Sequence, residues 1–162
     1  EIGTLDIKGV KMQVIEIPAI TPNFISVDKG PTYLSLLRFC ELIIITYRTQ
    51  NDLKIVRQEL NANEIKTQKI LYNGQNSIIT QIWKKLGLIK VYTKQPGKPK
   101  QLPPVALKKG STIKDLAFYV HKDFVKNFKF ARVWGRSAKF PGQQFGLDHV
   151  MSDEDVIELH LT

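Results

Sequence analysis

The order of the expected elements changes at Leu88, and this change divides the chain into two halves of different fold class. Residues 1–87 alternate between strand-like and helix-like patterns, which predicts an α/β domain with a mostly parallel sheet. Residues 88–162 run strand, strand, helix, strand, strand, which predicts an α+β roll of the β-grasp kind. A chain of 162 residues has room for two such small domains.

The expected elements of residues 1–87 follow from apolar spacing and from breaker residues. Two strands within residues 4–18 meet at a turn at Lys8-Gly9, and residues 19–30 form a loop. Beyond this loop the pattern predicts a helix over 33–39, a strand over 42–46, a helix capped by Asn51 or Asp52, a strand over 69–72 and a helix from Ser77 to Leu86.

The expected elements of residues 88–162 surround one well-defined helix. Ser111 or Thr112 caps this helix, in which Ile113, Leu116, Ala117 and Val120 follow the i, i+3, i+4, i+7 spacing of an amphipathic helix. Strands are expected over residues 88–93, 104–107, 128–134 and 155–161, with a turn segment over 95–104.

The charge of the chain is the first guide to its partners. The net charge is +9, and residues 88–162 carry 13 Lys and Arg against 7 Asp and Glu. Such a surplus favours a polyanionic partner such as RNA or the ribosome. The alternative is a surface of solvated lysines.

Cysteine content and hydropathy place the chain in a reducing compartment, and we expect it in the cytoplasm. Its one cysteine, Cys40, excludes an internal disulfide and a cysteine-rich zinc site. The longest apolar run, residues 42–45, is far shorter than the ~20 residues that span a bilayer. No signal-peptide pattern precedes it. The first residue is Glu1, which is consistent with a processed or partial piece of a longer chain.

The stretch 88–162 resembles the TGS domain, a ubiquitin-like module found in some GTPases, threonyl-tRNA synthetases and stringent-response enzymes. It is most similar to that of the developmentally regulated GTP-binding proteins, a branch of the Obg-type GTPases. The segments that carry the resemblance are LIKVYTK at 88–94, KKGST at 108–112, ARVWGRS at 131–137, GLDH at 146–149 and DEDVI at 153–157.

The stretch 1–87 is similar to part of the GTPase domain of the same family, with altered motifs. Glu16 and Ala19 stand where such GTPases have the Asp and Gly of an Asp-x-Pro-Gly motif, and Asn73 and Asn76 stand where Asn-Lys-x-Asp would read guanine. The phosphate-binding G-x-x-x-x-G-K-[ST] pattern is missing from the sequence. The resemblance therefore implies a degenerate, truncated GTPase-like domain over 1–87 that is not an enzyme and uses no cofactor, followed by a TGS domain over 88–162.

The missing motif raises a question about the sheet of residues 1–87. In such GTPases the strand that carries the phosphate loop lies between the hairpin strand near residues 11–17 and the strand at 42–46. We therefore expect the hairpin to pair directly with the strand at 42–46, because buried strands seldom leave backbone amides unpaired. Two separate sheets in residues 1–87 would contradict this expectation.

The cations of residues 88–162 are the candidate RNA-binding residues, because they fall in turns or flank the Trp134-Gly135 motif. The set is Lys94, Lys98, Lys100, Lys108, Lys109, Arg132, Arg136 and Lys139.

Other residues with known chemistry have a simpler structural interpretation. Three aromatic residues, Tyr92, Phe140 and Phe145, are able to stack on bases, but core packing is favoured, as it is for Trp134. The histidines stand far apart, with no ligand spacing that predicts a metal site. The acids at 153–155 are interpreted as solvated turn residues.

Three functions remain open at this stage. The first is a non-enzymatic, translation-associated protein that binds structured RNA or the ribosome, with no membrane role and no specificity for DNA. The second is a fragment of a GTP-binding protein whose phosphate-loop part is absent. The third is a protein–protein adaptor that recruits a dedicated partner through a sheet edge.

Overall fold

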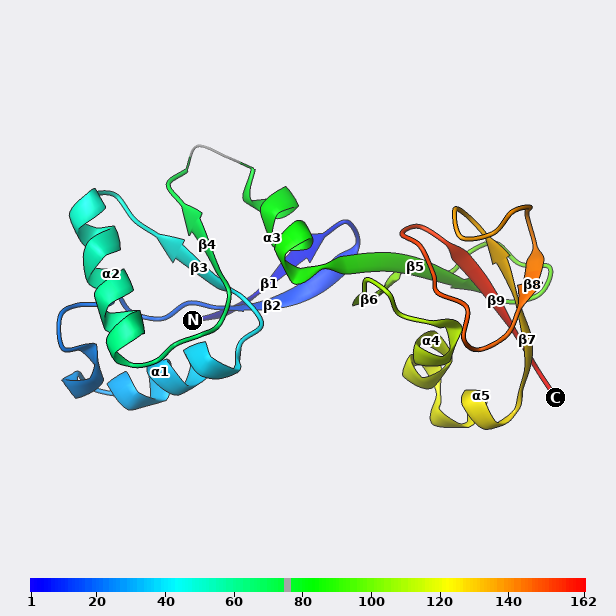
Figure 1. The fold of residues 1–162 in the computed structure, drawn as a ribbon, viewed down its shortest axis with the longest axis horizontal. Coiled ribbons are helices and arrows are strands. Elements are labelled where there is room, and N and C mark those ends of the chain that lie inside the picture. The colour runs from blue at the N-terminus through cyan, green and yellow to red at the C-terminus, as the bar shows by residue number, and fades with distance from the viewer. Residues whose placement is uncertain (75–76) are drawn as a thin grey trace. The chain divides into compact units, whose positions relative to one another are not determined.

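The computed structural model describes residues 1–74 and 77–162, which divide into two compact units (Figure 1). The first unit comprises Glu1–Leu5 and Gln13–Leu86, and the second comprises Asp6–Met12 and Gly87–Thr162. None of the described helices is both long and apolar enough to cross a bilayer.

The first unit packs short helices around a two-stranded parallel sheet. The strands are β3 (Ile43–Thr46) and β4 (Lys69–Tyr72), paired in the register Ile43↔Lys69. The helices are η1 (Phe24–Ser26), α1 (Gly30–Phe39), α2 (Gln50–Ala62) and α3 (Ile78–Leu86). Its core joins η1, α1, β3 and α2 through Phe24, Leu34, Leu37, Ile43, Ile45, Leu53 and Leu60. The predicted parallel pairing is confirmed for these two strands.

Local sequence explains where two of these helices begin. Helix α1 begins at Gly30, where a Cβ would lie 2.2 Å from the carbonyl oxygen of Phe24, so only glycine fits. Helix α2 is capped by Thr49, whose side chain accepts from the Asp52 N–H while the Asp52 carboxylate accepts from the Thr49 N–H. The prediction of Asn51 or Asp52 as the cap was therefore wrong by two or three residues, because Asp52 completes a capping box instead.

The N-terminal hairpin forms a sheet of its own. Strands β1 (Ile2–Ile7) and β2 (Val10–Ile15) pair with each other, and β3 and β4 form a separate sheet. The expectation that the hairpin pairs with the strand at 42–46 is therefore wrong. The turn of the hairpin is instead held within the second unit, where Ile7 is fully buried and Gly9 lies against the Pro104 ring.

The second unit is a five-stranded sheet in the order β6-β5-β9-β7-β8. Its strands are β5 (Leu88–Lys94), β6 (Val105–Lys108), β7 (Phe128–Trp134), β8 (Gln143–Phe145) and β9 (Val156–Leu161). The central pair β5–β9 is parallel and the other pairs are antiparallel. This mixed order, with helix α4 (Ile113–Val120) between β6 and β7, is that of the predicted ubiquitin-like β-grasp.

Successive side chains of a strand point to opposite sides of the sheet, so the sheet has two different faces. One face packs against α4 and carries the core residues Ile89, Val91, Ala131, Val133 and Ile157, which contact Ile113 and Leu116 of the helix. The other face, called here the polar face, carries the alternate residues of the same strands. They are Lys90, Tyr92 and Lys94 of β5, Phe130, Arg132 and Trp134 of β7, and Val156, Glu158 and His160 of β9.

Candidate nucleic-acid interface

Lys94 is the last residue of β5 on the polar face and contacts two neighbouring side chains. Its Nζ lies 3.1 Å from a carboxylate oxygen of Glu158 and 4.1 Å from the centre of the Trp134 ring. Glu158 is only 3% exposed, so the ammonium neutralises a carboxylate that burial would otherwise destabilise. Lys94, predicted as an RNA-binding residue, is thus placed as part of the fold of this face.

Glu158 receives a second bond from β9 itself. The Nε2 atom of His160 lies 2.6 Å from Glu158 Oε1, and the His160 ring stacks on Phe130 at 4.3 Å. Burial raises the pKa of Glu158, but the bonds from His160 and Lys94 together outweigh burial and lower that pKa below its usual value. The carboxylate therefore stays ionised, and the positive charge of Lys94 is compensated within the protein.

A second cluster lies around Tyr92 and Glu154. The Nζ of Lys100 sits 3.9 Å from the centre of the Tyr92 ring, a cation–π distance. Lys90 pairs with Glu154 at 3.1 Å. This bond from Lys90 is the main cause that lowers the pKa of Glu154, and Arg136 and Lys100 add weaker electrostatic contributions. Lys90 is therefore paired with Glu154, and Lys100 and Arg136 lie near the same carboxylate.

Three of the predicted cations project into solvent on or beside the polar face. Arg132 is exposed on the polar face opposite Glu158, and Arg136 and Lys139 are exposed in the loop that follows β7. Lys98 is exposed in the segment that folds back along β5, where Lys94 and Lys100 form a bridge pair. The structure therefore gathers six predicted cations on or beside the polar face.

The remaining two predicted cations lie beside the first residues of β5, at the end of the strand away from Lys94. Lys108 pairs with Leu88, and the Lys109 N–H donates to the carbonyl of Gly87. Six residues of extended strand, about 20 Å, separate Leu88 from Lys94. Lys108 and Lys109 are exposed but form a separate basic turn.

The loop 135–142 is fixed by the buried carboxylate of Asp155, which is fully shielded from solvent. Its Oδ2 accepts from the Ser137 hydroxyl at 2.6 Å and from the Ser152 N–H at 2.7 Å. The His149 Nε2 lies 2.8 Å from Ser137 Oγ. Because the Ser137 hydroxyl donates its proton to the Asp155 carboxylate, the serine oxygen accepts from the histidine ring. The backbone at Gly135, which has φ +149°, passes very close to Asp155. A Cβ at this position would fall 2.1 Å from Asp155 Oδ1.

This network corrects one prediction and explains a motif. The acids at 153–155 were expected to be solvated, but Asp155 is buried, and Asp153 accepts from the Lys90 N–H at 2.8 Å. Only Glu154 of the three is exposed. Gly135, Ser137, His149 and Asp155 all belong to segments that carried the family resemblance, and they meet in one network that holds the loop.

The aromatic residues considered above differ in their exposure to solvent, which the sequence did not show. Tyr92 is buried and Phe145 packs on the core while stacking on His149 at 3.5 Å, as expected for packing residues. Trp134 lies half-buried on the polar face beneath Lys94. Phe140, in contrast, is 60% exposed, so the expectation that it packs in the core is wrong.

The nucleotide-motif positions of the first unit lie in exposed segments. Glu16 and Ala19 follow β2 and Asn73 follows β4, and all three are exposed. The Glu16 N–H donates to the carbonyl of Glu1 at 2.8 Å. Asn76 lies outside the described residues.

The histidines are engaged in local contacts. His149 bonds Ser137, His160 bonds Glu158, and His121 accepts from the Asp123 N–H at 3.2 Å. Across residues 1–74 and 77–162, no group of three or more His, Cys, Asp or Glu is arranged to hold a metal ion.

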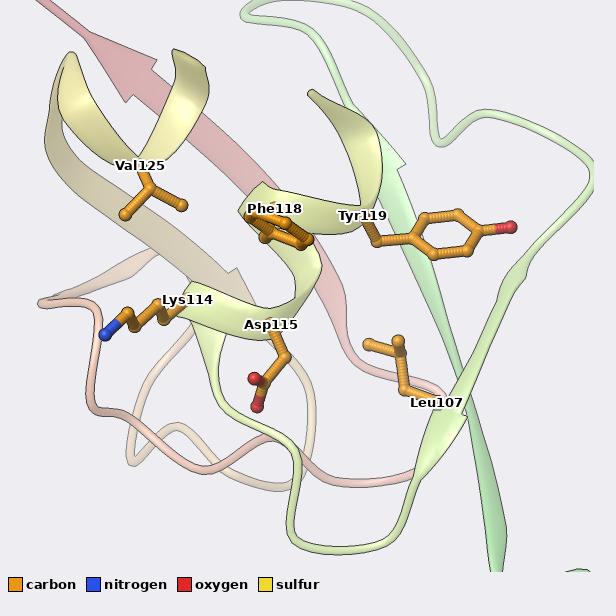
Figure 2. A pocket seen from close by; sticks show the side chains of 6 residues that line it. All are labelled: Leu107, Lys114, Asp115, Phe118, Tyr119 and Val125. Carbon is orange, nitrogen blue, oxygen red and sulfur yellow. The ribbon is translucent and has the colours of Figure 1, made fainter. Parts of the chain in front are cut away.

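A shallow depression of about 530 Å³ lies beside α4 (Figure 2). Figure 2 shows Phe118, Tyr119, Val125 and Leu107 around it, with Lys114 and Asp115 as its polar residues. The Asp115 carboxylate accepts from the Thr112 N–H at 2.7 Å and so caps α4. The lining therefore suits apolar contact better than catalysis.

Comparison with known proteins agrees with this arrangement. Residues 89–161 match the TGS domain. The chain is 42% identical over 113 residues to an uncharacterized GTP-binding protein of Methanocaldococcus jannaschii, covering 66% of this chain and 28% of that protein. It is 40% identical over 83 residues to a developmentally-regulated GTP-binding protein 2 homolog of Dictyostelium discoideum. It is 35% identical over 83 residues to developmentally-regulated GTP-binding protein 2 of Homo sapiens. Each of these two alignments covers 51% of this chain and 23% of the relative.

Among solved structures, a GTP binding protein from Pyrococcus horikoshii OT3 aligns with a TM-score of 0.47 and 20% identity, covering 75% of this chain and 45% of that one. This similarity is too low to carry an argument. The chain spans about a quarter of the length of the curated relatives named above.

The relatives overturn the prediction that the protein is not an enzyme. They are named as GTP-binding proteins, and the chain aligns with only the part of them that contains the TGS domain. The altered motifs in residues 1–87 therefore do not exclude nucleotide chemistry. Residues 89–161 match the TGS domain, and the chain is similar over 83 to 113 residues to proteins of the family of developmentally regulated GTP-binding proteins.

Proposed function

We propose that the protein is a translation-associated member of this family whose TGS domain binds RNA, with the ribosome as its main partner and the cytoplasm as its location. In this proposal residues 88–162 are the RNA-binding domain, and residues 1–87 are a degenerate part of a GTPase-like domain. Glu16, Ala19, Asn73 and Asn76 would then occupy former nucleotide-motif positions.

The observation that carries the proposal is the unequal use of charges in the TGS domain. Most of its acids are engaged within the domain: Asp115 caps α4, Asp153 and Asp155 accept backbone N–H groups, and Glu154 and Glu158 pair with lysines. Several cations instead extend into solvent, among them Lys98, Arg132, Arg136 and Lys139. The outward field of the domain is therefore positive, which suits phosphate contact and counterion release.

Sedimentation of the full chain with ribosomes over a salt series tests the proposal. Binding should weaken steeply with salt, because log K falls by nearly one log unit per tenfold salt for each phosphate contacted. The triple variant R132A/R136A/K139A should bind at least about tenfold more weakly and show a shallower salt slope.

A matched control removes the same charge elsewhere in the domain. Lys114, Lys122 and Lys126 are exposed on or beside α4 and α5 (Lys122–Lys126), so K114A/K122A/K126A has the same net charge as the test variant. Equal weakening by the two variants would mean that only net charge matters. Salt-independent sedimentation of the wild type would contradict RNA binding.

A second candidate is a docking role toward a dedicated protein partner. It is favoured by one observation: Phe118 and Tyr119 of α4 are 59% and 64% exposed beside the depression of Figure 2. Exposed aromatic side chains gathered at a hollow are typical of protein contacts. Under this alternative F118A should abolish capture of the partner, while R132A/R136A/K139A should retain it.

A further inference from the structure

Phe140, like Phe118 and Tyr119 of α4, is an aromatic residue of the TGS domain that lies mostly in solvent. Its side chain is 60% exposed in the loop between β7 and β8. Other aromatic residues of the domain have packing partners: Phe130 stacks on His160, Phe145 on His149, and Tyr92 lies beneath Lys100. A large apolar ring exposed to water contributes little to folding and is therefore accessible to a ligand.

The backbone that presents Phe140 is held in place from several sides. The Gly142 N–H donates to the Val133 carbonyl at 2.9 Å, and the Gln143 N–H donates to the Phe140 carbonyl at 3.2 Å. The Lys139 N–H donates to Gln143 Oε1 at 2.7 Å. Together with the anchoring of Ser137 by Asp155, these bonds order the loop before any ligand arrives, which lowers the entropic cost of binding through the ring.

The charges around Phe140 define what it would bind. Lys139 precedes it in the chain, Arg136 is exposed in the same loop, and Arg132 is exposed on β7. An exposed ring among cations matches a nucleobase between phosphates, since bases stack on aromatic rings while basic residues follow the backbone. A base within a duplex has both faces covered by its neighbours and is not available to such a ring.

On the basis of the RNA binding proposed above, we propose that Phe140 stacks on an unpaired base of a single-stranded RNA segment, with Arg136 and Lys139 at the adjoining phosphates. The TGS domain thereby selects looped or single-stranded RNA over duplex RNA. Asp155, Ser137 and His149 act as positioning residues, because they hold the loop rather than contact the RNA.

Binding of two RNA probes to the full chain tests this inference. The first is a fluorescein-labelled, hairpin-free oligonucleotide of about 12 nucleotides, within the 4–16 nucleotides that single-strand-binding modules cover. The second is the same sequence as a duplex. Fluorescence anisotropy gives the affinity of each for the wild type and for the variants F140A, F140L and F140W.

F140A should bind the single-stranded probe about ten- to a hundredfold more weakly, the range measured for loss of one base–aromatic stack. F140L should be equally weak, because leucine keeps the apolar volume but has no ring, and F140W should bind at least as well as the wild type. The salt slope should not change in F140A, since no phosphate contact is lost. Binding of the duplex should not change.

The matched control is F118A, which removes a ring of similar exposure, 59%, from α4 and should leave RNA affinity unchanged. Near-ultraviolet circular dichroism shows whether each variant remains folded. The stacking role would be overturned if F140A or F140L bound the single-stranded probe with wild-type affinity. The proposed function would still stand if the wild-type chain bound RNA with a steep salt slope. Wild-type chain that binds neither probe at low salt would overturn both.

Discussion

The two compact units differ in how well their strands are covered. In the first unit, apolar residues on the strands themselves face solvent, among them Ile2 of β1, Val14 and Ile15 of β2 and Leu71 of β4. In the second unit, most of the large exposed apolar residues lie on α4 or in loops, and the strands share one core with the helix. Since sheets of two strands are marginal alone and sheets of five are not, we expect the second unit to be the more stable.

The units also differ in the forces that hold them. The two buried charged residues among the described part of the chain, Asp155 and Glu158, both belong to the second unit. Each is satisfied by several donors, so the second unit combines an apolar core with two polar anchors. The first unit depends on the apolar cluster between α1, β3 and α2. Loss of one buried polar group should therefore lower the stability of the second unit and leave that of the first unchanged.

The largest expected effect is that of D155A on the second unit. The substitution leaves the Ser137 hydroxyl and the Ser152 N–H without their buried acceptor, and should lower the free energy of unfolding by about 3–5 kcal/mol. Urea unfolding in a W83F background measures this directly, because Trp134 then reports on the second unit alone. The exposed Asp148 provides the control D148A. Equal stability of D155A and D148A would show that the buried network does not hold this unit.

A smaller effect tests the boundary between the units. Ile7 is fully buried and groups with the second unit, whereas Ile2 of the same strand groups with the first and is 72% exposed. I7A should therefore destabilise the second unit by about 2–5 kcal/mol, as for other large apolar residues cut to alanine. I2A should change stability by less than about 0.5 kcal/mol. A loss of stability seen instead in the first unit, reported by Trp83 in a W134F background, would assign the whole hairpin to that unit.

The sequence predicted the elements of the second unit better than the joining of strands in the first. Helix α4 and four strands were predictable because their apolar spacing is regular, and Thr112 was among the two predicted caps. The short elements α5 and β8, of 5 and 3 residues, give no periodic signal. The separate hairpin was not predictable because its turn is held by distant residues such as Pro104, and a local pattern does not encode that contact.

For the candidate site, the sequence predicted a set of cations but not the surroundings of each one. Lys94 and Arg132 look alike in a charge pattern, yet Lys94 compensates buried Glu158 while Arg132 is exposed. The same holds for Phe140 and Phe145, one exposed and one stacked on His149. The difference depends on which face of the sheet or loop each residue occupies, and this is fixed by pairing across strands. The one available signal was the proline that follows Phe140, which is typical of a loop.

The smallest expected effect concerns pH and again separates the units. Burial lowers the pKa of His149 below its usual value near 6.5, and the nearby Asp155 only partly offsets this. The unfolded chain therefore binds a proton more readily than the folded chain, so the stabilisation is complete above about pH 6.5 and declines as the pH falls below it. We expect the second unit to lose stability as the pH falls below about 6.5. This loss should be smaller than the loss of stability in D155A or I7A.

The variant H149Q tests whether His149 causes this loss. Glutamine is able to donate to Ser137 but does not titrate, so H149Q should show a flatter dependence of the urea midpoint on pH across the same range. The decline expected from Glu158 lies lower, because its pKa is below its usual value near 4.5, and so does not overlap. If wild type and H149Q lost stability in parallel, the pH dependence would arise elsewhere. A second unit that gains stability on acidification would instead show that the folded state favours the imidazolium, and that Asp155 outweighs burial at this site.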